Sequence, residues 1–74
     1  MKSTKEFNIA LGEQLRICRK EKGLPLWQVA DHIGATRQQL GRYEEGLALI
    51  PTDRFVKASQ FLGKHPATLI ARAL

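Results

Sequence analysis

The chain has 74 residues, of which 43% are hydrophobic, so it is long enough for one small domain with a modest core. We expect no separate catalytic or effector domain in a chain of this length. The formal net charge of +5 favours an acidic partner such as a nucleic acid. Charge alone leaves open a basic protein that has no such partner.

Cysteine and histidine usage argues against a disulfide or a metal site. Cys18 is the only cysteine, so no intrachain disulfide and no cysteine-rich metal site can form. His32 and His65 are 33 positions apart and neither has a second ligand at the short spacing typical of zinc sites. We expect Cys18 in the core and both histidines on the surface.

No apolar run approaches the roughly 18 residues that a membrane span requires, and the amino end has no signal-peptide pattern. The single cysteine is consistent with a reducing compartment. We therefore expect a cytoplasmic protein with no membrane, cofactor or small-molecule ligand. No nucleophile with its base and no paired carboxylates stand out, so we do not expect an enzyme.

The first predicted helix covers residues 6–22 and follows a polar, flexible N-terminus at residues 1–5. Ser3 and Glu6 have the spacing of a capping box, in which each side chain accepts a hydrogen bond from the other residue's backbone N–H. Gly23 is expected to end this helix.

Residues 26–46 predict two short helices joined by a tight turn. Apolar residues at helical spacing place one face of the first helix inward: Leu26, Val29, Ala30 and Ile33. Gly34 ends that helix because glycine adopts the left-handed conformation at low cost, and Thr36 is suited to cap the next helix. Leu40 and Tyr43 then face inward. This pattern is typical of a helix-turn-helix whose second helix enters a DNA groove.

Two more helices are expected after this motif. Thr52 is a suitable N-cap for the fourth helix, which Gly63 ends, and Pro66 is suited to the first position of a fifth. No strand pattern or repeat is present. The sequence therefore predicts an all-α, compact five-helix domain over residues 6–74.

The chain resembles the phage repressor and Cro family of helix-turn-helix domains, also called the xenobiotic-response-element type. The residues that carry the resemblance are Ile9, Leu15, Arg19, Gly23-Leu24, Val29-Ala30, Ile33-Gly34, Thr36, Leu40, Tyr43-Glu44, Gly46, Pro51, Leu62 and Gly63. The resemblance implies a lambda-repressor-like fold that binds operator DNA as a dimer. It also implies an ion pair between Arg19 and Glu44.

Four side chains on the outer face of the second motif helix are candidates for contact with DNA bases. The guanidinium group of Arg37 can bind O6 and N7 of guanine, and the amide of Gln38 can bind N6 and N7 of adenine. Arg42 lies one turn later and can reach a base or a phosphate. Gly41 allows close approach of the helix backbone to the groove. In the alternative, glycine at this position has no function and is a tolerated sequence change. Alternatively, Arg37 and Arg42 are solvent-exposed charged residues that contact no DNA.

Contacts with the DNA backbone are expected from Thr36, Gln39, Trp27 and Gln28. Leu26 stands where the family commonly has a glutamine that clamps the backbone, so this clamp is in doubt. Trp27 replaces a usually polar residue and is either exposed or folded over the rim of the core. Additional positive charge near the phosphates is expected from Lys20, Lys22 and Arg54.

The loop at residues 47–50 is unusually aliphatic for a surface turn. Ile50 is expected to join the core, whereas Leu47 and Leu49, together with Ile70 and Leu74, are candidates for a dimer or partner contact. Packing within the monomer is the alternative.

These features lead to two functional hypotheses. In the first, the protein is a sequence-specific transcriptional regulator, a repressor that binds a near-palindromic operator as a homodimer with its second motif helix in the major groove. In the second, the fold serves as a protein-interaction module, similar to an antiactivator, that binds a partner through Leu26, Trp27 and the loop at residues 47–50.

Overall fold

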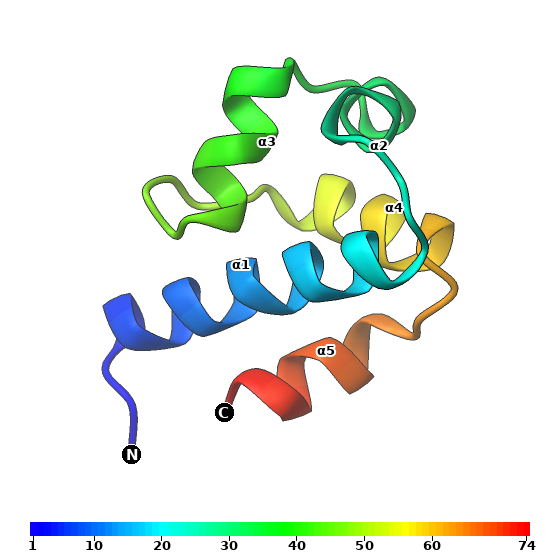
Figure 1. Ribbon diagram of the computed structural model, residues 1–74. Coiled ribbons are helices and arrows are strands. Elements are labelled where there is room, and N and C mark those ends of the chain that lie inside the picture. The colour runs from blue at the N-terminus through cyan, green and yellow to red at the C-terminus, as the bar shows by residue number, and fades with distance from the viewer.

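A computed structural model of the protein describes all 74 residues and contains five α-helices and no strands. In Figure 1 the long helix α1 crosses the molecule between α2 and α3 on one side and α5 on the other. This architecture confirms the predicted all-α, five-helix fold. The helices are α1 (Thr4–Glu21), α2 (Leu26–Ile33), α3 (Arg37–Glu44), α4 (Thr52–Phe61) and α5 (Pro66–Ala73).

Helix α1 begins at Thr4, two residues before the predicted start, because Ser3 is its N-cap. The Ser3 hydroxyl accepts a hydrogen bond from the Glu6 N–H at 3.1 Å, and the Glu6 carboxylate accepts one from the Ser3 N–H at 3.0 Å. The predicted capping box is therefore present, and residues 4 and 5 belong to the helix. Hydrogen bonds from the Ser3 backbone and hydroxyl lower the pKa of Glu6.

The ends of the later helices differ from the prediction in two details. Thr52 is the first residue of α4, and the N-cap position belongs to Pro51, which supplies no side-chain hydrogen bond. The start of α5 has a cap that the sequence did not suggest, because His65 Nδ1 accepts a hydrogen bond from the Ala67 N–H at 3.1 Å. Pro66 follows His65 as the first residue of α5, as predicted.

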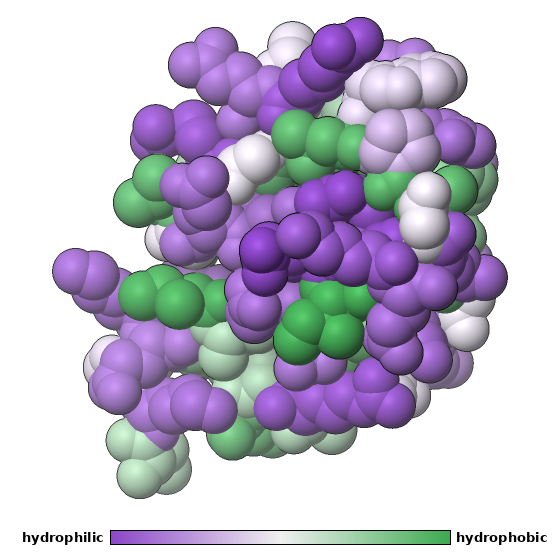
Figure 2. Space-filling view, in the orientation of Figure 1, coloured by the Kyte–Doolittle hydropathy of each residue, from purple (hydrophilic) through white to green (hydrophobic).

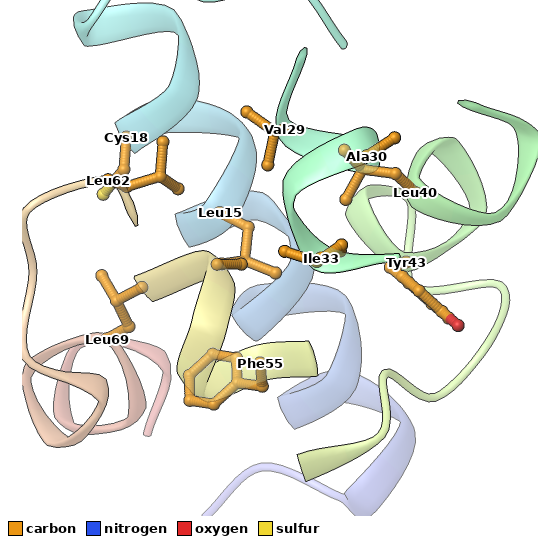
Figure 3. Packing of buried hydrophobic residues seen from close by; sticks show 11 residues of the cluster. Leu15, Cys18, Val29, Ala30, Ile33, Leu40, Tyr43, Phe55, Leu62 and Leu69 are labelled. Atoms are coloured by element: carbon orange, nitrogen blue, oxygen red, sulfur yellow. The ribbon is translucent and has the colours of Figure 1, made fainter. Parts of the chain in front are cut away.

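All five helices contribute to one hydrophobic core (Figure 3). Ile50 packs against this core from the loop after α3 and is half-buried, and Cys18 is fully buried, both as expected. The core residues are Leu15, Cys18, Val29, Ala30, Ile33, Leu40, Tyr43, Phe55, Ala58, Leu62 and Leu69.

Helices α1 and α3 approach each other so closely that their backbones touch. Gly12 of α1 is buried against the end of α3, and a Cβ at Gly12 would meet the carbonyl oxygen of Tyr43 and lie 2.8 Å from that of Glu44. Only glycine fits there without a backbone shift. This contact holds the C-terminal end of α3 against the long helix and thereby sets the direction in which α3 projects.

Candidate nucleic-acid interface

The turn between α2 and α3 has the conformation that the sequence predicts. Gly34 follows α2 with φ +74°, in the left-handed region. The Ala35 N–H then donates to the Ala30 carbonyl at 2.9 Å, which closes the end of α2. Three residues, Gly34 to Thr36, separate the two helices. The tight turn fixes α3 relative to α2 and completes a helix-turn-helix.

The start of α3 is held by a second capping box. The Thr36 hydroxyl accepts from the Gln39 N–H at 3.0 Å, and Gln39 Oε1 accepts from the Thr36 N–H at 2.9 Å. Thr36 thus has the capping role predicted for it and keeps its hydroxyl proton for another acceptor. The reciprocal role of Gln39 was not predicted, although glutamine three residues after threonine is a known sequence signal for this box.

The outer face of α3 is polar and open to solvent. Arg37 and Gln38 are exposed, and their side chains make no hydrogen bond or ion pair within the protein. Arg42 is also exposed and has one long contact, from Nη2 to the Leu47 carbonyl at 3.5 Å. The structure therefore places the three candidate base-contacting side chains on an unobstructed surface.

Gly41 lies between these side chains and is not required by the packing of the protein. A Cβ at this position would find only one atom within 4 Å, Leu26 Cδ2 at 4.0 Å. Glycine inside a helix costs about 1 kcal/mol of stability relative to alanine. No contact within the domain explains why glycine occupies this position. The remaining explanations are a bound partner that approaches the helix backbone closely, and neutral sequence drift.

The inner face of α3 carries the ion pair that the resemblance implied. Arg19 Nε lies 2.7 Å from Glu44 Oε2, and Arg19 Nη2 lies 3.0 Å from Glu44 Oε1, a two-point contact. Arg19 Nη1 also donates to the Leu24 carbonyl at 2.9 Å. The hydrogen bonds to Glu44 raise the pKa of Arg19, so its charge persists at every physiological pH. The pair ties α1 to the last turn of α3.

Arg54 of α4 makes contacts that the sequence did not reveal. Its Nη1 donates to the Tyr43 hydroxyl at 2.8 Å and lies 3.5 Å from Gln39 Oε1, and its Nη2 donates to the Gly34 carbonyl at 2.9 Å. We expected Arg54 only as a positive charge near the phosphates. Its partners lie 11 to 20 positions away, and no local pattern indicates such a pairing.

The beginning of α2 presents Trp27 to solvent, with 46% of the residue exposed. Of the two alternatives for Trp27, the exposed one is observed, and Gln28 beside it is half-buried. Leu26 packs against the core, so the position at which the family commonly has a clamping glutamine turns inward here. Pro25, the N-cap of α2, contributes no side-chain hydrogen bond.

The aliphatic candidates for a dimer or partner contact are exposed. Leu47 is 61% exposed and Leu49 69%, and both line a hollow beside the first turns of α1. Ile70 and Leu74 are 39% and 77% exposed and border other hollows next to Phe7. The four side chains therefore surround the N-terminal half of α1. In Figure 2 apolar residues on the visible face form several separate areas between hydrophilic ones.

Two further observations concern metals and membranes. The structure contains no group of three or more His, Cys, Asp or Glu side chains arranged to hold a metal ion. His32 is exposed, as expected, but its ring stacks on Phe61 with 4.0 Å between the ring centroids. None of the five helices combines the length and apolar character that crossing a membrane demands.

The chain is similar to a curated protein sequence and to solved structures over most of its length. It is 42% identical over 52 residues to a protein of Bacillus subtilis (strain 168) named "SPbeta prophage-derived uncharacterized HTH-type transcriptional regulator YonR". That match covers 70% of this chain and 48% of the relative, so the chain spans about half the length of this curated protein.

Two crystal structures of the clp gene regulator ClgR from Corynebacterium glutamicum have the same fold. They superpose with TM-scores of 0.86 and 0.83, each at 25% identity over 90% of this chain. The match covers 71% of the ClgR chain in one structure and 87% in the other.

The family model described as "Helix-turn-helix domain" matches residues 10–72, which include both motif helices and the core. The narrower resemblance to phage repressors and Cro stays a prediction. By this match and by its fold, the chain belongs to the helix-turn-helix domain family.

Proposed function

We propose that the protein is a sequence-specific DNA-binding transcriptional regulator, a repressor that binds a near-palindromic operator as a homodimer with α3 in the major groove. The observation that carries this proposal is the contrast between the two faces of α3. The inner face is buried and tied to α1 and α4, whereas on the outer face Arg37 and Gln38 make no side-chain bond within the protein and Arg42 makes only one long contact, to the Leu47 carbonyl.

The free side chains match the chemistry of base edges in the major groove. Arg37 at the first position of α3 offers a planar two-donor group to guanine, and Gln38 offers a donor and an acceptor to adenine. Each such two-point contact discriminates against a wrong base by about 1–3 kcal/mol. Arg42, one turn further, contacts a base or a flanking phosphate, and Gly41 lets the helix backbone approach the groove.

Contacts with the DNA backbone surround these base contacts. The Thr36 hydroxyl proton and the Gln39 amide group remain available as donors at the N-terminal end of α3. Trp27 and Gln28 lie at the start of α2, where the exposed indole can lie along the sugar-phosphate edge with its N–H as donor. The net charge of +5 supports association with DNA.

A homodimer follows from the need to present two copies of α3. Two-fold symmetry places the recognition helices about one helical turn apart, roughly 34 Å, on adjacent half-sites. We propose that the exposed side chains Leu47, Leu49, Ile70 and Leu74 contribute to this contact. The names of the relatives, both regulators, support the regulatory role, and we place it in the cytoplasm.

The alternative is a protein-interaction module, and one observation favours it. Trp27 is 46% exposed next to a position where Leu26 replaces a polar residue, and two leucines of the loop after α3 are also exposed. In that case Trp27→Ala abolishes capture of a protein partner and leaves DNA binding unchanged.

Selection of binding sites from a random duplex pool at near-physiological salt, repeated with Arg37→Ala, tests the proposal. We expect a palindromic site and a loss of preference at one base position per half-site in the variant, with a reduction in affinity of about 10-fold to 100-fold. Lys57→Ala is the matched control, because Lys57 is an exposed cation on α4. Salt-sensitive binding without sequence preference, or no binding, contradicts the proposal.

A further inference from the structure

The guanidinium group of Arg54 connects three parts of the helix-turn-helix from outside it. It donates to the Gly34 carbonyl at the end of α2, to the Tyr43 hydroxyl in the last turn of α3, and toward Gln39 Oε1 in the first turn of α3. Arg54 itself is half-buried on the first turn of α4. One side chain thus spans the turn and both ends of α3.

These contacts determine which way the Gln39 amide points. Its two neighbours, the Thr36 N–H at 2.9 Å and Arg54 Nη1 at 3.5 Å, are both donors. Only the amide oxygen can accept from donors, so the oxygen must face them. The amide nitrogen then has two hydrogens and no partner in the protein, and Gln39 is exposed. Gln39 therefore presents donors alone to its surroundings.

We propose that Arg54 is a positioning residue for DNA recognition. It holds the end of α2 and the last turn of α3 together through the Gly34 carbonyl and the Tyr43 hydroxyl. Its guanidinium also reinforces the orientation of Gln39 that the Thr36 N–H sets, in which the amide nitrogen donates to a phosphate oxygen of DNA. This inference rests on the proposed function, since it concerns the same DNA-facing surface. Arg54 acts through Gln39 and Tyr43, so the shape of its planar, five-donor group matters and not only its charge.

Arg54→Lys separates these two roles because it keeps the charge and loses the planar group. The probes are the duplex recovered from the random pool and a scrambled duplex of the same length, each titrated at several salt concentrations. We expect the Kd for the selected duplex to rise about 10-fold and the Kd for the scrambled duplex to rise less, because a phosphate contact serves both duplexes and the placement of α3 serves base recognition only. The salt dependence of both should be unchanged, since the charge is kept. Lys57→Gln on the same helix is the control.

A second variant, Gln39→Glu, tests the amide orientation directly. The glutamate keeps an oxygen facing the Thr36 N–H and Arg54, so the urea midpoint of unfolding should be unchanged or higher. It replaces the outward donors by an anionic oxygen, so the Kd for the selected duplex should rise by more than about 10-fold. Gln60→Glu makes the same charge change on an exposed site of α4 and should alter the Kd much less.

When a duplex is selected, three outcomes overturn the inference. The first is an Arg54→Lys protein that binds the selected duplex like the parent, and the second is equal weakening of both duplexes by Arg54→Lys. The third is a lower urea midpoint for Gln39→Glu. If no duplex is selected at all, the proposed function fails. Amide hydrogen exchange in the free protein then tests separately whether Arg54 holds the first turn of α3. Faster exchange of the Gln39 N–H in Arg54→Lys than in Lys57→Gln supports the positioning role, and equal exchange overturns it.

Discussion

The two faces of α3 differ in what the rest of the molecule demands of them. The inner face consists of Leu40, Tyr43 and Glu44, all buried, and contacts α1 through a backbone approach and an ion pair. The outer face carries exposed Arg37 and Gln38, which no other part of the chain contacts through a side-chain bond. Substitutions on the inner face should therefore change stability, and substitutions on the outer face should change binding.

Breaking the inner ion pair should have the largest effect. Glu44→Ala leaves the Arg19 guanidinium, whose side chain is only 12% exposed, without its partner. Removing one member of a buried pair costs about 3–5 kcal/mol, against about 4–11 kcal/mol for the total stability of a domain of this size. Urea unfolding should show a large fall in the midpoint. Glu45→Ala, next to it but exposed, is the control, and equal midpoints for the two variants would contradict a structural role for the pair.

The backbone contact between α1 and α3 should give the next largest effect. In Gly12→Ala the new methyl group meets the Tyr43 and Glu44 carbonyl oxygens, which belong to backbone and cannot rotate away. We expect a loss of about 1–3 kcal/mol, measured by urea unfolding, because helices α1 and α3 must separate. A variant as stable as the parent would show that the helices can shift freely.

The same substitution on the outer face should have the opposite effect on stability. Gly41→Ala adds a methyl group to open space within a helix and should stabilise the free domain by about 1 kcal/mol. Thermal unfolding measures this gain, while titration of the selected duplex should show weaker binding, because the methyl group enters the space proposed for the groove. Unchanged binding would rule out close approach at Gly41 and leave drift as its explanation.

We expect the smallest change in stability at Glu6. This residue lies in the first turn of α1, away from α3, and serves as a reference for purely local stabilisation. Its pKa is lowered from 4.5 because the carboxylate accepts hydrogen bonds from Ser3. A lowered folded-state pKa means that the stabilisation is present above pH 4.5 and disappears as the pH falls through the folded-state value. The difference in stability between the parent and Glu6→Gln should therefore shrink toward acid pH, in urea unfolding measured from pH 6 downward. A difference that is constant with pH would contradict this assignment.

Local sequence patterns predicted most of the fold. Helical spacing of Val29, Ala30 and Ile33, the glycine at position 34 and the cap at Thr36 act within a few residues of each other, so their consequences can be derived without the rest of the chain. The same holds for the burial of Cys18, whereas the sequence left open whether Trp27 is exposed. The start of α1 was placed two residues late, although the capping box that sets it was recognised.

The contacts that position the candidate site were harder to predict. Nothing around Gly12 indicates that its Cα hydrogen faces the backbone of α3, and nothing around Arg54 indicates three acceptors on the turn and on α3. The ion pair between Arg19 and Glu44 was expected only through the resemblance to a family. Contacts between residues far apart in the chain depend on how helices pack, and packing depends on all side chains of the core together.

Residues within one or two turns of each other therefore specify the five helices, their inward faces and the polar character of the outer face of α3, since these depend on helical periodicity and on capping. How α3 is held, and which polar atoms near it are already used, depends instead on the packing of the helices against each other. The pairing of Arg19 with Glu44, the contacts of Arg54 and the outward direction of the Gln39 amide arise where α1, α3 and α4 meet. Hydrogen bonds depend on distances of a few ångströms, and only the packed arrangement of the helices sets those distances.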